Sequence, residues 1–379
     1  MSQQQSPGTS EHLGEAGILA RLLTHVPGGD RVEVGPGDDA AVVDLPGTRL
    51  VITTDTMVEG FDFLAHTTCP RWIGHKAAVQ NLADVAAMGA RPIALVAAVS
   101  TPADTPVGWF EQVTEGLTRR AGEDGAQLVG GDLGRADRPT LTITAVGVLG
   151  EGERAVLRSG ARPGDILAVG SPALGRSAAG LAAVLSGTVQ VDGDGTVLIA
   201  PGTGGTPAAP PSHPATTPLD PALLTQLEGL VAWHNAPDPD LSLGWASGRA
   251  ATAMMDLSDG LVRDGGRIAV ASGVQVDLDA TALGGDVDAL AVPASVLDAD
   301  PWDWVLHGGE EHAMLATFAP GAVPQGFRVI GVIREHVGQP APRVLLDGEP
   351  ITGEGFDHFG WSRLIDHPSP DSWHGRVPK

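Results

Sequence analysis

Five short acidic motifs constrain this chain more than any other feature of its sequence. Each lies where an apolar stretch gives way to Gly, Thr or Ser. If a fold brings their carboxylates together, each pair at 4 Å repels by about 4 kcal/mol at an effective dielectric of about 20. Such a cluster must be protonated or bind cations, and oxygen ligands alone favour Mg²⁺, which usually arrives with phosphate. The motifs are GDDAA (Asp38, Asp39), TTDT (Asp55), NLADVAAMG (Asp84), VGGD (Asp132) and MDLSDGL (Asp256, Asp259).

Taken singly, an aspartate that follows a strand more often serves a turn or a helix cap. Asp84 differs because it lies inside an expected helix, on one face with Ala77 and Asn81. A solvated helix face is the alternative there. The set of five motifs, each beside small residues that let phosphate approach closely, favours the cation site.

Size and charge narrow the class of protein. The chain has 379 residues, enough for two domains, and its formal net charge of −23 disfavours partners bound through phosphate backbones or anionic membranes. Cys69 is the only cysteine, which excludes an internal disulfide and a Cys-based zinc site. No uncharged apolar stretch approaches about 20 residues, and no signal-peptide pattern opens the chain. We therefore expect a cytoplasmic protein that binds neither nucleic acid nor membrane.

Hydrophobic periodicity and turn residues predict an α/β (α+β) fold class. Expected strands cover 50–54, 93–99, 126–129, 141–149 and 166–169, and another ends at 254–255. Expected helices cover 15–23, 72–88, 106–121 and about 177–185. Ser258 or Asp259 is the expected N-cap of a further helix.

Composition divides the chain into domains. We expect a flexible tail over 1–14, an N-terminal α/β domain over 15–150, and a C-terminal α/β domain over 155–379. The segment RSGARPGD (158–165) marks the junction. Residues 186–220 are rich in Gly, Pro and Thr, which predicts a flexible insertion in the C-terminal domain.

The usual phosphate-binding devices are missing. Lys76 and Lys379 are the only lysines and neither follows Gly, which excludes a Walker A loop. The protein-kinase motif set is absent too. Positive charge must come from metal and Arg, and Arg158 is the natural candidate, with a surface salt bridge as the alternative. The segment 170–180 (GSPALGRSAAG) can cradle phosphate at a helix start, although Gly and Ala also serve close helix packing.

An ordered set of motifs runs from about residue 15 to residue 359: GDDAA, TTDTMVEG, KAAVQNLADVAAMGA, GGD, RSGARPGD, SAAGL, DLSDGL and GGE. This set resembles the thiamine-monophosphate kinase family, of the superfamily that includes aminoimidazole ribonucleotide synthetase and selenophosphate synthetase. The resemblance implies an N-terminal α/β domain that forms a β-barrel across a homodimer, a C-terminal α/β domain, and an active site between them. It also implies ATP-dependent phosphorylation of thiamine monophosphate to thiamine diphosphate, by direct in-line transfer of the γ-phosphoryl group assisted by several Mg²⁺ ions.

The resemblance assigns roles to individual residues. The catalytic residues would be Asp55, Asp84, Asp132 and Arg158. The metal ligands would be Asp39, Thr53, Thr54, Asp55, Asp84, Asp132, Asp256 and Asp259, with Asp38 adjacent. ATP contacts would fall on Gly131, Asp132, Arg158 and Ser258. Substrate contacts would fall on Asp62, Glu310 and Phe356, although Phe356 without the resemblance is better explained as a core aromatic.

Some positions depart from the family pattern. Asp62 replaces a usual His, Glu311 and His312 replace Asp and Tyr after GGE, and residues 234–240 (HNAPDPD) lack the expected Arg. These changes concern the substrate side and keep two alternatives open. One is an ATP-dependent synthetase resembling aminoimidazole ribonucleotide synthetase. The other is a MgATP-binding homologue that has lost catalysis.

Overall fold

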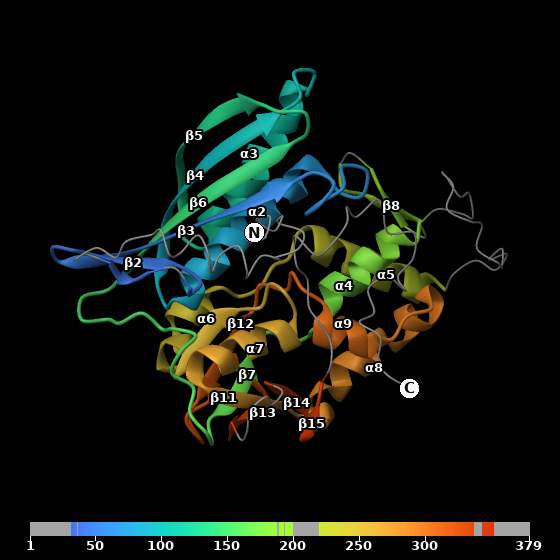
Figure 1. Cartoon of the computed structure of the whole chain (residues 1–379). Helices are drawn as coiled ribbons and strands as arrows, with labels where there is room; N and C mark the ends of the chain where they lie inside the picture. The colour runs from blue at the N-terminus through green and yellow to red at the C-terminus, as the bar shows by residue number, and fades with distance from the viewer. Residues whose placement is uncertain are drawn as a thin grey trace, which may run out of the picture.

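The computed structural model describes residues 32–35, 37–187, 189–192, 194–199, 220–336 and 343–351. Within them, two large β-sheets, each with parallel and antiparallel strands, are each packed against their own helices, which gives a two-domain α/β fold (Figure 1). This confirms the predicted fold class. The tail 1–14, the expected helix 15–23 and Phe356 lie outside the described residues, and a barrel shared by two chains stays a prediction.

The first sheet has the strand order β1-β2-β3-β6-β4-β5, in which only β4 and β5 are parallel. Burial alternates along β6, where Leu141, Ile143 and Ala145 are buried and face the helices. The strands are β1 Val32–Val34, β2 Ala41–Leu45, β3 Thr48–Val58, β4 Arg91–Thr101, β5 Gln127–Arg135 and β6 Thr140–Leu149.

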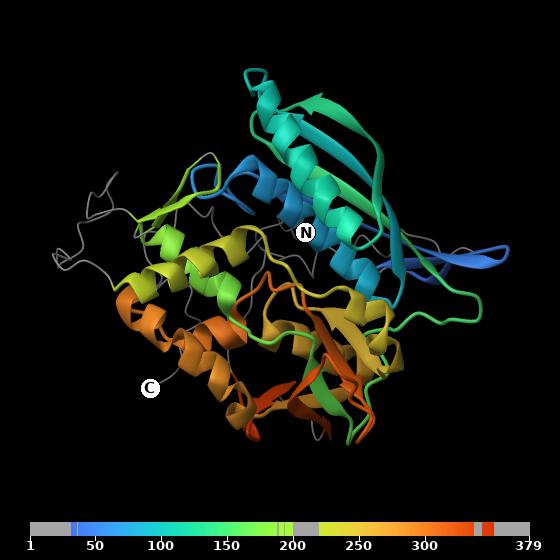
Figure 2. The same cartoon turned by 180° about the vertical axis from the view of Figure 1, so that it is seen from behind.

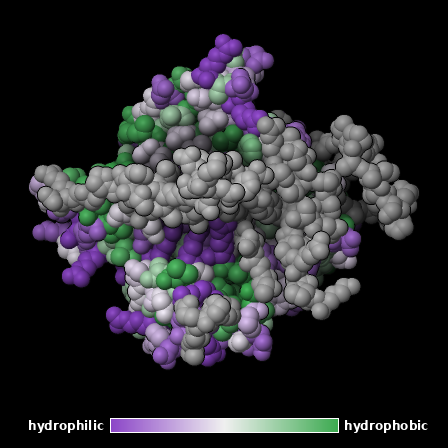
Figure 3. All heavy atoms as spheres, viewed as in Figure 1, coloured by the Kyte–Doolittle hydropathy of each residue, from purple (hydrophilic) through white to green (hydrophobic). Residues whose placement is uncertain are grey.

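Two helices, α2 (Pro70–Ala87) and α3 (Val107–Glu123), cover one face of this sheet (Figure 2). They approach so closely that a Cβ on Gly74 would lie 1.9 Å from the carbonyl oxygen of Val113. The edge strand β5 and its neighbour β4 leave Val96, Val129 and Leu133 exposed, by 40%, 64% and 73%. Apolar surface (green) is visible over this part of the domain in Figure 3.

The second sheet has the order β10-β12-β7-β13-β11-β14-β15. Its strands are β7 Ile166–Val169, β10 Ala253–Asp256, β11 Val274–Leu278, β12 Met314–Phe318, β13 Arg328–Glu335, β14 Val344–Leu346 and β15 Glu349–Pro350. Its helices are α4 Arg176–Leu185, α5 Pro221–Asn235, α6 Ser242–Trp245, η2 Ser247–Ala250, α7 Leu261–Ser272, α8 Ala280–Leu297 and α9 Pro301–His307.

The expected insertion contains regular structure. Strands β8 (Val189–Val191) and β9 (Val197–Ile199) pair antiparallel, so its first part forms a hairpin. Residues 200–219 lie outside the described residues.

Most expected elements match observed ones, but three local predictions are wrong. Asp55 lies within β3 rather than directly after it, and the strand expected to end at Gly130–Asp132 continues through these residues as β5. Gly260, not Ser258 or Asp259, is the N-cap of α7, and no side chain caps it. Gly260 is required there because its φ is +105° and a Cβ would lie 2.6 Å from the His307 carbonyl oxygen.

Helix α8 is long and apolar enough, with a mean hydropathy of 1.2, to cross a membrane by composition alone. Its buried Asp286 instead forms a bidentate pair with Arg328 of β13 and accepts a hydrogen bond from the Leu174 N–H. These contacts are those of a helix packed against the second sheet.

Helix α2 joins the two domains. Leu82 and Ala86 belong to the core of the first sheet, and the same core includes Met254, Met314 and Phe318 of the second. The core is therefore continuous across the domain boundary, and the polar face of α2 lies at that boundary.

Candidate active site between the domains

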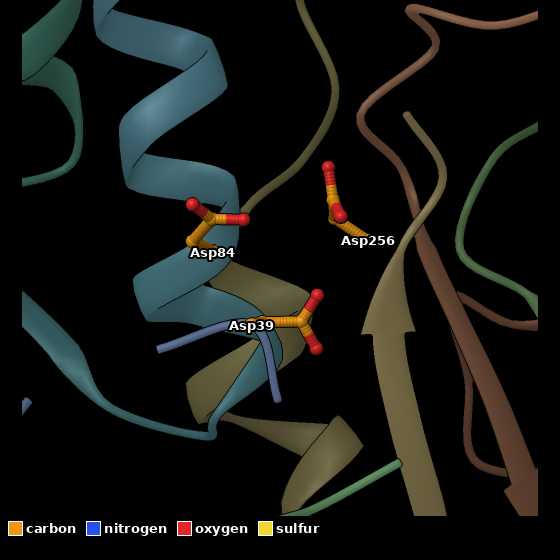
Figure 4. A group of neighbouring side chains, drawn as sticks. All are labelled: Asp39, Asp84 and Asp256. Carbon is orange, nitrogen blue, oxygen red and sulfur yellow. The ribbon is translucent and has the colours of Figure 1, made fainter. Parts of the chain in front are cut away.

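Three aspartates from separate parts of the chain converge at the domain boundary. Asp39 follows β1, Asp84 lies on α2, and Asp256 ends β10 of the other domain. One carboxylate oxygen of each lies within 4.8 Å of the other two. Figure 4 shows the side chains pointing toward one another. We call these residues the aspartate cluster.

Local sequence explains how Asp84 is held. Asn81, one turn earlier on α2, donates to the Ala77 carbonyl oxygen and accepts a hydrogen bond from the Asp55 N–H at 3.0 Å. The Thr53 hydroxyl donates to Asp84 Oδ2 at 2.9 Å. The predicted helical face of Ala77, Asn81 and Asp84 therefore faces the TTDT motif on β3.

The electrostatics of the cluster fit a bound cation. Burial, and then the charges of Asp256, Asp39 and Asp55, raise the pKa of Asp84 well above its usual value. Burial also raises the pKa of Asp39 to about 7, although Arg158 opposes it. Asp39 Oδ2 is buried and has no hydrogen-bond partner among the described residues. An orphaned carboxylate oxygen beside two further carboxylates is a donor set suited to a hard divalent cation.

Arg158 binds the first acidic motif. Its Nη2 donates to Asp39 Oδ1 at 2.8 Å, and its backbone N–H donates to Asp38 at 3.1 Å. Burial lowers the pKa of Arg158, but the Asp39 carboxylate more than offsets this, so the guanidinium stays charged. The arginine predicted to replace a P-loop lysine thus lies at the cluster.

The DLSDGL motif supplies the next carboxylate. Asp259 Oδ2 lies 2.6 Å from Arg267 Nη2 of α7, and the Asp259 N–H donates to Asp264. The Ser258 carbonyl oxygen accepts from the Glu310 N–H at 2.7 Å. Ser258 and Asp259 therefore connect the aspartate cluster with the GGEEH loop.

Two glutamates of that loop, Glu310 and Glu311, form what we call the glutamate pair. Glu310 lies 2.7 Å from Lys76 of α2, which is buried, and 3.3 Å from His234 of α5. Its backbone adopts φ +60°, a strained conformation typical of functional loops. Glu310 therefore joins both domains at the site.

Glu311 faces the second domain. It accepts hydrogen bonds from the Ser177 N–H and the Trp233 indole, and Arg176 lies 3.7 Å away, stacked on the Trp233 ring. The next residue, His312, places Nδ1 3.1 Å from Asp256 Oδ2. Both departures from the family pattern are thus buried parts of the polar network.

Other predicted residues are not brought to the cluster in the described chain. The Thr54 hydroxyl donates to the Ile143 carbonyl oxygen, and Asp62 accepts from the Val58 N–H in a turn after β3. Gly131 and Asp132 lie on the edge strand β5. Across the sheet, Asp132 lies opposite Ala98 of β4, which lies opposite Thr142 of β6, which in turn lies opposite Thr56 of β3. Three strand spacings, about 14 Å, therefore separate β5 from β3.

Sequence reasoning missed Lys76, His312 and Arg267 as site residues. Lys76 carried a signal, because it is the only lysine among the described residues and lies two turns before Asp84 on α2. Arg267 follows Asp264 at i+3 spacing, which places both on one helix face.

Known proteins resemble this chain over most of its length. A family model described as AIR synthase related protein, N-terminal domain, matches residues 37–149. The thiamine-monophosphate kinase of Mycobacterium tuberculosis is 39% identical over 358 residues, 94% of each chain. That of Corynebacterium glutamicum is 38% identical, covering 85% of this chain and 86% of its own. The solved structure of AaThiL complexed with AMPPCP and TMP superposes with a TM-score of 0.74 at 26% identity, covering 94% of this chain and 100% of its own.

Proposed function

The chain belongs to the thiamine-monophosphate kinase family, and we propose that it phosphorylates thiamine monophosphate with ATP to give thiamine diphosphate and ADP. The observation that carries this is the aspartate cluster, built from both domains of a chain that is 39% identical to such a kinase over 94% of its length. It lies where a triphosphate and a phosphate can be brought together between the domains.

We propose Mg²⁺ as the cation. Asp39, Asp84 and Asp256 would hold it, and Asp55, whose charge acts on Asp84, and Asp259, three residues after Asp256, would serve further ions. All five offer carboxylate oxygens, the ligands that Mg²⁺ prefers. When bound, the metal supplies neutralisation of phosphate charge. Asp132 stays a predicted ligand, since it lies apart from the cluster in the described chain.

The reaction requires little proton transfer by the protein. The accepting oxygen belongs to a phosphate monoester that is largely ionised near neutral pH, so no strong general base is needed. Catalysis then consists of positioning and charge neutralisation. Arg158 would bind phosphate oxygens, while Thr53 and His312 hold the carboxylates of Asp84 and Asp256 in place.

Glu310 is the proposed contact for the organic part of the substrate. Burial would raise the pKa of Glu310, but the Lys76 ammonium group lowers it below its usual value, so the carboxylate stays ionised. An ionised carboxylate suits the positively charged thiazolium ring of thiamine monophosphate. Asp62 and Phe356 stay predictions for this contact.

We also propose a homodimer. The exposed Val96, Val129 and Leu133 on β4 and β5 offer an apolar surface that a second copy of the sheet would cover. Light scattering of the wild type and of Leu133→Asp tests this. We expect a dimer for the wild type and a monomer for the variant, whereas a monomeric wild type at micromolar concentration would contradict the proposal.

A product assay tests the function. Purified protein with ATP, Mg²⁺ and thiamine monophosphate should yield thiamine diphosphate and ADP in equal amounts by chromatography. A folded protein that forms neither product across several Mg²⁺ concentrations would contradict the assignment. ATP binding without turnover would instead favour the catalytically inactive homologue, and ADP formation with an aminoimidazole ribonucleotide precursor would favour the synthetase.

A further inference from the structure

Two arginines bind aspartates of the acidic motifs. Arg158 binds Asp39, and Arg267 binds Asp259. Burial lowers the pKa of Arg267, its two carboxylate partners raise it by more, and the positive charge of Arg158 opposes them. Both guanidiniums therefore stay charged and lie at aspartates that are predicted to bind the cations of ATP.

Arg267 is held at one end by a fixed anchor. Its Nη1 donates to Asp264 Oδ1 at 2.8 Å, and Asp264 is fully buried. The other oxygen of Asp264 accepts from the Asp259 N–H, so the anchor is tied to the DLSDGL loop. The side chain of Arg267 is 30% exposed, and its Nη2 lies 2.6 Å from Asp259 rather than at the buried anchor.

Arg267 Nη2 is paired with Asp259, a residue that is also a proposed metal ligand. Asp259 is a proposed ligand of the cations that accompany ATP, and a guanidinium 2.6 Å from it competes for the same oxygen. A carboxylate that serves a cation no longer neutralises Arg267. The nearest new anion for Nη2 is then the polyphosphate that the cation brings.

We propose that Arg267 is a second phosphate-binding arginine of the nucleotide site. It turns from Asp259 to a phosphate oxygen of ATP when Asp259 serves a cation, while Asp264 keeps hold of Nη1. The proposal rests on the proposed kinase function only in taking ATP as the ligand. Arg267 thereby makes nucleotide binding and cation binding at Asp259 depend on each other.

A purely structural role predicts different behaviour. If Arg267 only held the DLSDGL loop, its loss would weaken the binding of cations and of nucleotide alike. If it changes partners, its loss should weaken nucleotide binding but strengthen the binding of a cation alone, because Asp259 loses a competing guanidinium.

The test compares Arg267→Gln with Arg267→Lys and with Arg119→Gln, an arginine that is 74% exposed on α3. Calorimetry with the non-hydrolysable AMPPCP and Mg²⁺, without thiamine phosphate, should show about tenfold weaker binding for Arg267→Gln. We expect partial recovery in Arg267→Lys and none of this loss in Arg119→Gln. Electron paramagnetic resonance with Mn²⁺ alone should show that Arg267→Gln binds this ion at least about threefold more tightly than the wild type does.

Unchanged AMPPCP affinity in Arg267→Gln would overturn the proposal, and so would weaker Mn²⁺ binding accompanying weaker nucleotide binding. If Arg267→Gln does not fold, Arg267→Lys carries the same two measurements. Failure of the kinase function would show separately, as a wild type that binds AMPPCP but forms no thiamine diphosphate.

Discussion

The aspartate cluster and the glutamate pair are both acidic groups at the domain boundary, but they are balanced differently. Glu310 and Glu311 have two full cations, Lys76 and Arg176, in addition to hydrogen bonds. The aspartate cluster has three carboxylates for one guanidinium, and Asp39 Oδ2 has no hydrogen-bond partner among the described residues.

This difference separates a group of carboxylates that requires a cation from one whose charge is already balanced within the protein. A buried carboxylate paired with a cation of the protein needs no ligand in the folded state. Removal of either partner leaves an uncompensated charge. A surplus of buried carboxylates destabilises the protein until a cation is supplied. The aspartate cluster should thus respond to Mg²⁺, and the glutamate pair should not.

The largest expected effect comes from removing a carboxylate of the aspartate cluster. Asp84→Asn should lower turnover by about 10³-fold, because the phosphate groups lose part of the charge neutralisation that positions them. Without Mg²⁺ the variant should unfold at a higher temperature than the wild type, since a like charge is gone. Steady-state kinetics and calorimetric unfolding measure both.

Asp44→Asn on the exposed face of β2 is the matched control and should change neither quantity. If Asp84→Asn still gains stability from Mg²⁺ as the wild type does, Asp84 is not a ligand and the comparison fails.

The glutamate pair should show the opposite behaviour. Glu311→Ala should lower the free energy of unfolding by about 3 kcal/mol, because Arg176 and the Trp233 indole lose a buried partner. Urea unfolding measures this. The stabilisation that Mg²⁺ confers should be the same as in the wild type, and a variant that lost it would show that the two groups act as one site.

A third prediction uses pH. The pKa of Asp39 is raised to about 7, so its protonated form stabilises the metal-free protein fully below about pH 4, and that contribution is lost as pH rises through about 7. Mg²⁺ requires the ionised form, so its affinity should rise about tenfold per pH unit for each proton released, and level off above about pH 7. Mg²⁺ titrations from pH 5.5 to 8.5 measure this.

In Asp39→Asn the Mg²⁺ affinity should rise less steeply with pH, because one proton fewer is released when the cation binds. A wild-type affinity independent of pH over this range would show that the cluster is already ionised without metal.

The same contrast explains how far the sequence could predict the site. Asp84 and Arg158 were recognisable because each lies in a distinctive local motif, and α2 places Asp84 and Asn81 on one face by helical spacing alone. Which carboxylates converge depends on strand register and domain docking, which local motifs do not encode. Asp132 illustrates this, because its strand lies three positions from β3 in the sheet.

The partners of the glutamate pair were even harder to predict from the sequence. Lys76 reaches Glu310 only because α2 packs against both domains, and Arg176 reaches Glu311 only through the position of α4. Both contacts join residues far apart in the chain, so no spacing rule could find them. The prediction of alternating strands and helices succeeded because it needed only local periodicity.

The smallest effect should come from the hydroxyl that borders the glutamate pair. Ser177 Oγ lies 3.0 Å from His234 Nδ1, which also lies 3.3 Å from Glu310. Burial, and then Lys76, lower the pKa of His234 to about 3, so the ring is neutral near pH 7 and Nδ1 serves only one of these partners as donor or acceptor at a time. Ser177→Ala should therefore cost about 1 kcal/mol of stability, the worth of one hydrogen bond.

Lys76 still balances Glu310 in Ser177→Ala, and the Ser177 N–H still binds Glu311, so turnover and Mg²⁺ affinity should stay at wild-type values. Ser186→Ala, at the exposed end of the same helix, is the control and should cost less. A loss above about 3 kcal/mol would mean that Glu310 depends on the neutral His234 as much as on Lys76. The glutamate pair would then not be balanced by its two cations alone, and the contrast with the aspartate cluster would be one of degree.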